Sequence, residues 1–218
     1  MPTLLMNDAY PCFCEALQRL GYVIIPTKKI DCFHQPEQRH ADMQCLRIDD
    51  TFFALQDCQS PVGRDYPANV RLNCLYLGGK LYGNLKAVDP AVLAYCRHHH
   101  IDAVHVNQGY TRCSALVLHD RAVITADKSI EKALQKNGVE VLLIAPGHIR
   151  LEGFDYGFIG GAGFAMDSNV YFFGNITKHP DYANIKAFCE KNQLILNILC
   201  GDLPLTDIGG VVLQTESD

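Results

Sequence analysis

Cys113 stands where a nucleophile could act. It follows Arg112 at the start of an apolar segment, CSALVL, and both come after a loop rich in hydrogen-bonding side chains, NQGYT. A cysteine reacts as its thiolate, so such chemistry needs a base and charged groups around the sulfur. The chain has ten cysteines, most of them in apolar segments, and a small buried thiol is a common core residue. Nucleophile and core thiol are therefore both open interpretations of Cys113.

The segment that starts at Cys113 has a regular order of elements. It runs from strand CSALVL through a turn at residues 119–120 to strand RAVITA, a helix over about residues 128–137 and strand VEVLLIA. Segments that start at Asn73 and Gly160 repeat this order, each with a tight hairpin turn and a helix that begins near a proline and an aspartate. We therefore predict three ββαβ units.

Two further units are incomplete or divided. One begins near His40 with strands MQCLRI and TFFALQ, and an irregular segment replaces its helix. The other has its first strand, DIGGVVL, after Asp207, while TLLM, the helical CFCEALQRL and YVII lie at the N-terminus. The sequence therefore predicts one α/β domain over residues 1–218, in which five ββαβ units close into a ring by pairing of the N- and C-terminal strands.

Loops that lead into the first strands of such a ring would meet near its axis and form a central concave site. An ordinary strand start would be glycine, serine or threonine. These positions instead include a base, two carboxylates, two amides and a thiol. The candidate residues are His40, Asp42, Asn73, Gln108, Arg112, Cys113 and Asp207.

Each candidate also has a plainer interpretation. His40 lies in a polar loop, where a solvent-exposed or turn-capping histidine is ordinary. Asp42 and Asp207 could hydrogen-bond backbone amides at strand starts. Asn73 and Gln108 could hold loops in place. The run of glycines at 160–163 lacks the GxGxxG pattern before a helix, so a bulge or close packing explains it better than a dinucleotide site.

Several motifs resemble those of a known protein family. The segments VNQGYTRCS, ITADKSI, PGHIRLEGFDYGFIGGA, KHPDY and PLTDIGG resemble an uncharacterised bacterial family of about this length, grouped with guanidino-modifying enzymes. The five-unit pattern resembles the pentein superfamily, which includes arginine deiminase, agmatine deiminase, dimethylarginine dimethylaminohydrolase and the amidinotransferases. The resemblance implies a pentein-type β/α-propeller fold.

The resemblance also implies roles for the candidate residues. In these enzymes a carboxylate before Gly-Gly is followed one unit later by a histidine in HxD and two units beyond by the nucleophilic cysteine. Asp207, His40 and Cys113 occur in this order, circularly shifted along the chain. The resemblance thus implies that these three are catalytic. Substrate binding would fall to Asp42, Asn73, Gln108 and Arg112, with Arg112 as the one candidate anchor for a substrate carboxylate.

Two functions follow from these observations. The first is a cysteine-dependent hydrolase or transferase acting on a guanidino or amidine C–N bond of a small molecule, with Cys113 attacking, His40 moving protons and Asp42 and Asp207 holding the cation. Cys113 should then react fastest of the ten thiols with an alkylating probe. The second is a non-catalytic binding or interaction protein with the same fold, whose axial residues are structural.

Composition limits the partners. A formal charge of −5 and no long basic run give no electrostatic footprint for nucleic acid or an anionic membrane, so a small-molecule ligand is expected. No apolar segment reaches the roughly 20 residues of a spanning helix, and we expect a cytoplasmic protein with reduced thiols. Neither Cys12 with Cys14 nor the histidines at 98–100 complete a zinc ligand set, so neither a metal nor a cofactor is expected. A homo-oligomer stays open.

Overall fold

The computed structural model describes residues 1–214, and it has a mixed α/β fold built from short strands and helices. Its α-helices and strands alternate along the chain, with three short 3-10 helices between them. In chain order these elements are β1 (Thr3–Met6), α1 (Pro11–Arg19), β2 (Val23–Pro26), η1 (Gln35–Arg39), α2 (Ala41–Gln44), β3 (Cys45–Ile48), β4 (Thr51–Ala54), η2 (Leu55–Asp57), β5 (Leu75–Leu77), β6 (Lys80–Gly83), α3 (Pro90–His98), β7 (Asp102–His105), β8 (Ala115–His119), β9 (Ala122–Thr125), α4 (Lys128–Lys136), β10 (Glu140–Leu143), β11 (Gly163–Met166), β12 (Asn169–Asn175), η3 (Ile176–Lys178), α5 (Tyr182–Lys191), β13 (Ile195–Pro204) and β14 (Val211–Gln214).

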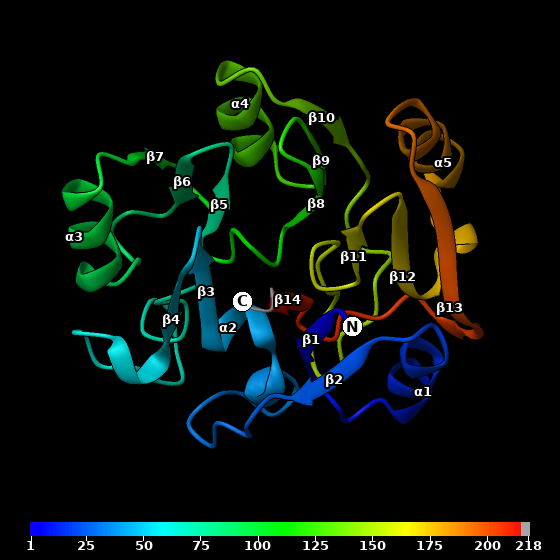
Figure 1. Ribbon diagram of the computed structural model, residues 1–218, viewed down its shortest axis with the longest axis horizontal. Coiled ribbons are helices and arrows are strands. Elements are labelled where there is room, and N and C mark those ends of the chain that lie inside the picture. The colour runs from blue at the N-terminus through cyan, green and yellow to red at the C-terminus, as the bar shows by residue number, and fades with distance from the viewer. Residues whose placement is uncertain (215–218) are drawn as a thin grey trace.

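The strands form five small sheets, which Figure 1 shows placed around the centre of the molecule. In the sheets β5-β6-β7, β8-β9-β10 and β11-β12-β13, the first two strands are an antiparallel hairpin and the third, after a helix, runs parallel to the second. The three ββαβ units predicted from the sequence are therefore confirmed. The unit that begins near His40 has only the hairpin β3-β4, as its missing helix pattern indicated.

The two ends of the chain meet in the fifth sheet, β14-β1-β2. β1 lies antiparallel to β14, with Leu4 opposite Leu213, and parallel to β2, with Leu4 beside Ile24. The predicted pairing of N- and C-terminal strands is thus present. In Figure 1 the blue N-terminal strand and the red C-terminal strand lie together near the centre.

Local sequence explains where the helices begin. The Asp127 carboxylate accepts hydrogen bonds from the Ser129 and Ile130 backbone N–H groups at the start of α4. Asp89 caps α3 in the same way through Ala91, with Pro90 at the first helical position. Each cap satisfies backbone donors that have no partner within the helix. These helices close the outer side of their units and leave the first strands nearer the centre (Figure 1).

The helices and sheets bury several apolar clusters. The cluster under α1 includes Leu4, Met6, Phe13 and Phe173, each with 0% of its surface exposed. It therefore joins the N-terminal strand to β12, far along the chain. Within residues 1–214, none of the helices has the length and apolar character needed to cross a membrane.

Removing the buried side chain of β1 should destabilise the fold. We expect Leu4→Ala to lower the free energy of unfolding by about 2–5 kcal/mol, because it leaves a cavity between β1, α1 and their neighbours. Leu20→Ala, at a position that is 56% exposed, is the matched control and should change stability by less than about 0.5 kcal/mol. Denaturant unfolding followed by circular dichroism measures both; equal stabilities would show that β1 is not part of the cooperative structure.

Candidate active site

Five candidate residues from the loops before different first strands gather in one buried cluster. They come from the segments that precede β3, β5, β8 and β14. Each exposes 3% of its surface or less, although all but the cysteine are polar or charged. Buried polar groups of this density are costly unless they are hydrogen-bonded or bind a ligand. The members of this cluster are His40, Asp42, Asn73, Cys113 and Asp207.

Asn73 joins the thiol to the HxD segment. Its side-chain amide nitrogen Nδ2 donates to Cys113 Sγ at 2.9 Å and to the Asp42 backbone oxygen at 3.0 Å. Its carbonyl oxygen Oδ1 accepts from the backbone N–H groups of Arg112, at 2.9 Å, and Cys113, at 3.3 Å. An amide with both ends used in this way fixes the sulfur relative to Asp42. Asn73 is therefore more than a loop staple: it contacts the candidate nucleophile directly.

Neither carboxylate oxygen of Asp42 accepts a hydrogen bond from an N–H or O–H group, although only 1% of the residue's surface is exposed. The Cys113 thiol lies within hydrogen-bonding reach of this carboxylate. His40 precedes the short helix α2, and Asp42 lies in its first turn, so both side chains reach the cluster from one turn of backbone. The His40 Nδ1 atom lies 4.0 Å from Asp42 Oδ1, which is an ion-pair separation and too long for a hydrogen bond. The carboxylate therefore has free acceptor capacity beside the imidazole.

Asp207 is held by backbone donors. Its Oδ2 accepts from Phe158 N–H at 2.8 Å and its Oδ1 from Gly209 N–H at 2.9 Å. The glycines near it allow close approach: a Cβ on Gly161 would overlap Asp207 Oδ1, and one on Gly209, at φ +85°, would overlap the His40 side chain. The Gly-Gly after Asp207 and the glycine run at 160–163 thus have a packing reason, as the sequence indicated.

Glu37 is an additional carboxylate that the sequence analysis did not select. It lies in η1, three residues before His40, with 5% of its surface exposed and no partner for Oε2. Asn69, which is 1% exposed, has an unpartnered Oδ1 while its Nδ2 donates to the Tyr110 hydroxyl at 2.7 Å. In the sequence, HQPEQRH looks like an exposed polar loop. The one feature of the sequence that indicates a role for Glu37 is its position three residues before His40.

Burial and like charges control protonation in the cluster. Burial raises the pKa of the Cys113 thiol well above its usual value, and the carboxylates of Asp42 and Asp207 raise it further. Burial also raises the pKa of Asp42, with Asp207 adding to the shift. Burial lowers the pKa of His40, against an opposing effect of Asp207. In the free protein, the thiol and the imidazole are therefore both neutral near pH 7.

The side chains of Gln108 and Arg112 point away from the cluster. Gln108 Nε2 donates to Asp127 Oδ2 at 3.0 Å, and its Oε1 accepts from Tyr110 N–H at 3.1 Å. The Arg112 guanidinium donates to backbone oxygens of Ala115, at 3.3 Å, and Val211, at 3.4 Å. Arg112 thus has a structural role, because its guanidinium supplies hydrogen bonds to backbone carbonyl groups of the neighbouring strands. Its expected role as a carboxylate anchor has no support in this geometry.

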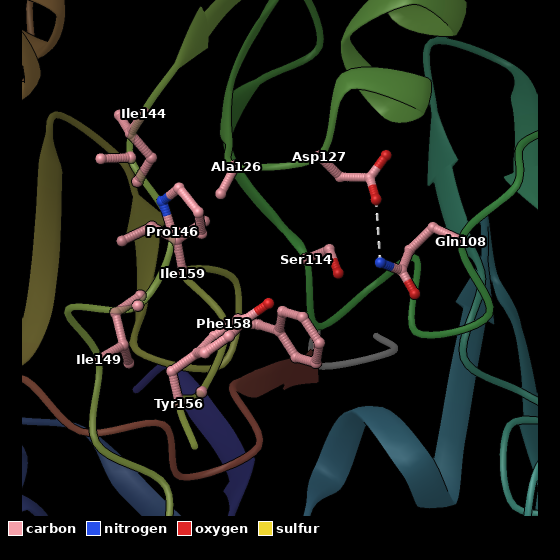
Figure 2. Close-up of a pocket in the computed structure, with 13 residues that line it drawn as sticks. Gln108, Ser114, Ala126, Asp127, Ile144, Pro146, Ile149, Tyr156, Phe158 and Ile159 are labelled. Atoms are coloured by element: carbon pink, nitrogen blue, oxygen red, sulfur yellow. Dashed lines mark hydrogen bonds between the residues drawn. The ribbon is translucent and has the colours of Figure 1, made fainter. Parts of the chain in front are cut away.

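Two cavities lie on either side of these loops. One, of about 490 Å³, is lined by the first strands of all five sheets and by Arg112. The other, of about 80 Å³, is shown in Figure 2 and includes Gln108 and Ser114. Neither is lined by Cys113, which packs against apolar side chains, among them Phe33 and Phe158. The segments 27–39 and 146–159 thus contribute to the apolar cluster that buries the thiol, together with Met43, Val70 and Ala87.

A metal centre is not indicated by the described part of the chain. Residues 1–214 contain no group of three or more histidine, cysteine, aspartate or glutamate side chains arranged to hold a metal ion. The described cysteines are all free thiols. The arrangement instead places one thiol, one imidazole and three carboxylates together, which are the groups for nucleophilic and proton-transfer chemistry on a cation.

The burial of Cys113 changes the labelling expected from the sequence. In the free protein at neutral pH we expect iodoacetamide to modify Cys32, which is exposed, well before Cys113, whose thiol is buried and has a raised pKa. Time-resolved peptide mass spectrometry measures both rates. Faster labelling of Cys113 would mean that the cluster opens readily without a ligand.

Glu37 should make stability depend on pH. Burial, together with the charge of Asp207, raises the pKa of Glu37 from 4.5 to about 7. The folded protein then binds more protons than the unfolded chain between these values, so this group lowers stability as pH rises from about 4.5 to about 7. Glu37→Gln should remove this effect. The difference in free energy of unfolding between the variant and the wild type should therefore be more favourable to the variant at pH 8 than at pH 5, by on the order of 1 kcal/mol.

Denaturant unfolding at both pH values tests this prediction. Glu152→Gln, at an exposed position, is the control and should follow the wild type at both pH values. If Glu37→Gln also follows the wild type, Glu37 ionises as freely in the folded protein as in the unfolded chain.

Solved structures with the same fold are dimethylarginine dimethylaminohydrolases. One is a histidine-to-glycine variant in an adduct with S-methyl-L-thiocitrulline, with a TM-score of 0.58, 9% identity, and coverage of 97% of this chain and 99% of that one. Another, from Pseudomonas aeruginosa, is a cysteine-to-serine mutant complexed with citrulline, with a TM-score of 0.58, 9% identity, and coverage of 96% and 95%. The likeness to pentein superfamily members expected from the sequence is confirmed at the level of the fold.

Sequence comparison gives a family but no described activity. No curated protein matches the chain by sequence. A family model described as a family of unknown function, DUF6873, matches residues 49–212, which include most of the sheets and the positions of Asn73, Cys113 and Asp207. This match covers most of the chain, and the protein therefore belongs to the DUF6873 family.

Proposed function

We propose that this protein is a cysteine-dependent hydrolase or transferase that acts on a guanidino or amidine C–N bond of a small molecule. The observation that carries the proposal is the Asp42 carboxylate, which is buried against the Cys113 thiol and has no N–H donor for either oxygen. A bound cation with several N–H groups would supply the missing donors. A guanidinium or amidinium ion has that charge and geometry, and its carbon is the electrophile that a thiolate attacks.

The charges around the thiol favour a cationic ligand. Burial raises the pKa of Asp42, the charges of Asp207 and Glu37 raise it further, and the charge of Arg112 opposes part of this rise, so the carboxylates are near enough to repel one another when ionised. The hydrogen bonds that Asp207 accepts come from uncharged backbone N–H groups. A positive ligand would offset this repulsion and hold the carboxylates in their charged form.

The same ligand would activate the nucleophile. In the free protein the carboxylates and burial disfavour the thiolate. A cation bound against Asp42 and Asp207 would reverse the local field, lower the pKa of the thiol and let its proton pass to the neutral imidazole of His40. The thiolate would therefore form mainly when substrate is present.

The proposed reaction has two stages. Cys113 Sγ bonds to the amidine carbon, and the C–N bond to the leaving amine breaks as His40 returns the proton to that nitrogen. This leaves an amidino group covalently attached to sulfur. A water molecule in a hydrolase, or an acceptor amine in a transferase, then attacks the carbon while His40 takes its proton. The C–S bond breaks and the thiol is restored.

We propose that the whole chain, residues 1–218, is a single domain that supports this site. The five sheets would form a closed β/α-propeller, with the β1–β14 pairing as its seam and the site at its hub. We expect it to act in the cytoplasm, where its free thiols stay reduced. Access to Cys113 would need movement of the segments 27–39 and 146–159, which now cover it.

A second candidate function is a non-catalytic binding protein. The observation that favours it is the complete burial of the cluster, since Cys113 lines neither cavity in this structure. In that case Asp42 would still bind a cation, but Cys113 would form no covalent product. Mass spectrometry after incubation with guanidines separates the two functions, because only the enzyme forms an amidino adduct or a ureido or transferred product.

A cationic alkylating probe should find Cys113 where its neutral analogue does not. We expect 2-chloroacetamidine to modify Cys113 at least tenfold faster than 2-chloroacetamide, because the amidinium is drawn to Asp42 and Asp207. Asp42→Asn should reduce this ratio by about tenfold, the effect of losing about 1.4 kcal/mol of charge interaction. Peptide mass spectrometry measures both rates at pH 7.5.

Two controls accompany this experiment. Cys32, exposed and outside the cluster, gives the intrinsic ratio of the two probes in the same sample. Asp120→Asn, at an exposed position, should leave the Cys113 ratio unchanged. Equal ratios for Cys113 and Cys32 would sink the proposal of a cation site beside the thiol.

A further inference from the structure

The cavity of about 80 Å³ shown in Figure 2 lies between the loop before β8, the start of α4 and the segment 144–159. Its walls are largely apolar, with Ile144, Pro146, Ile149 and Ile159 among the lining residues. At about 10–15 Å³ for each water-sized group, the space holds about six such groups. It is therefore large enough for a short aliphatic chain and too small for a bulky ligand.

This cavity shares walls with the Cys113 cluster. Ser114, which lines it, is the residue after Cys113. Phe158 also lines it, packs in the apolar cluster that contains Cys113, and donates its backbone N–H to Asp207 at 2.8 Å. Ser114 and Phe158 therefore form the boundary between the cavity and the candidate nucleophile, and a substrate that reaches both would displace the Phe158 side chain while its backbone N–H still holds Asp207.

The charged lining residue has no free capacity for an ion. Asp127 Oδ1 accepts from the Ser129 and Ile130 N–H groups at 2.7 and 3.0 Å, and Oδ2 accepts from Gln108 Nε2 at 3.0 Å. This carboxylate already caps α4, so it neutralises the helix end that would otherwise attract an anion. A carboxylate in the cavity would face Asp127, and an ammonium group would have to compete with its existing donors.

Unlike Asp127, the lining residue Ser114 has free hydrogen-bonding capacity. Its hydroxyl is buried, with 3% of the residue exposed, and has no hydrogen-bond partner. Figure 2 shows it in the cavity lining, with Gln108 on one side and Phe158 on the other. A small apolar site with one unsatisfied hydroxyl fits an uncharged group that carries a single hydrogen-bonding atom.

We propose that this cavity binds the N-substituent of the substrate, and that this substituent is a short, uncharged aliphatic group with at most one polar atom, which pairs with the Ser114 hydroxyl. The inference rests on the proposed function, because it places the reacting amidine at Cys113. It excludes substrates that carry a carboxylate or an amine at the far end of a four-carbon chain. In agreement with this, Arg112, which is the one candidate anchor for a substrate carboxylate, already donates its guanidinium N–H groups to the backbone oxygens of Ala115 and Val211.

Calorimetric titration of the full-length Cys113→Ala protein measures binding without turnover. The ligands are methylguanidine, butylguanidine, 4-guanidinobutanoate and 4-aminobutylguanidine. We expect butylguanidine to bind at least tenfold more tightly than methylguanidine, and the two charged analogues to bind no more tightly than methylguanidine. Charged analogues that match butylguanidine would overturn the inference.

A cavity-filling variant tests the location. Ala126→Leu adds bulk to the cavity lining and should abolish the tenfold gain of butylguanidine while leaving methylguanidine binding unchanged. Ala133→Leu is the matched control, since Ala133 is also half-buried, within α4, but does not line the cavity, and it should keep the gain. Persistence of the gain in Ala126→Leu would place the substituent elsewhere and overturn the inference.

A neutral probe without an amidine separates failure of the subsite from failure of the proposed function. Butanamide should shift the methyl NMR signals of Ile144 and Ile159 in the wild type and not in Ala126→Leu. If butanamide shifts these signals while methylguanidine and butylguanidine do not bind, the cavity binds uncharged groups as inferred and the proposed guanidino function is wrong. If butanamide leaves these signals unchanged, the subsite itself is refuted.

Discussion

The candidate site is dominated by carboxylates that are buried together, and the charge of Arg112 offsets only part of the resulting rise in the pKa of Asp42. Asp42 has two unpartnered oxygens, Asp207 is satisfied by backbone N–H groups, and Glu37 has one unpartnered oxygen nearby. Burying such groups costs free energy that no other part of the cluster returns in the free protein. A protein retains this cost most readily where a bound cation offsets it, and burial and the neighbouring carboxylates raise the pKa values of Asp42 and Glu37.

The fold makes this concentration of charge feasible. The members of the cluster come from the segments before the first strands of four small sheets, β3, β5, β8 and β14, and three of these strands are held in antiparallel hairpins. The small sheets thus form a rigid framework that tolerates the unfavourable free energy of burying these polar groups. The two chain ends pair through β1 and β14, and the segment after Asp207 is joined to the HxD segment where the Asp42 N–H donates to the Gly209 backbone oxygen at 3.1 Å. Dimethylarginine dimethylaminohydrolases share this fold at 9% identity, which leaves function to be argued from the site.

The resting site is closed and neutral at its reactive atoms. Apolar residues from the segments 27–39 and 146–159 pack over Cys113, and the thiol and imidazole are both uncharged near pH 7. Under the proposed function, such a site would limit unwanted oxidation or alkylation of the thiol and couple its activation to the arrival of a positive ligand. Phe158 takes part in both features, since it covers the thiol, holds Asp207 and lines the adjoining cavity. Movement of one short segment would therefore affect nucleophile, carboxylate and subsite together.

Local chemistry in the sequence determined the ββαβ units and the missing helix of one unit, because hairpin turns, helix caps and strand patterns act over a few residues. The repeat of these units then indicated the pairing of the chain ends, because each end alone supplies only part of a fifth unit. It also selected His40, Asp42, Asn73, Cys113 and Asp207, which follow from their place before first strands. Only the tertiary structure decided that Gln108 and Arg112 turn away and that Glu37 and Asn69 are buried. The direction of a loop side chain depends on which donors and acceptors neighbouring strands leave unsatisfied, and those neighbours are distant in the sequence.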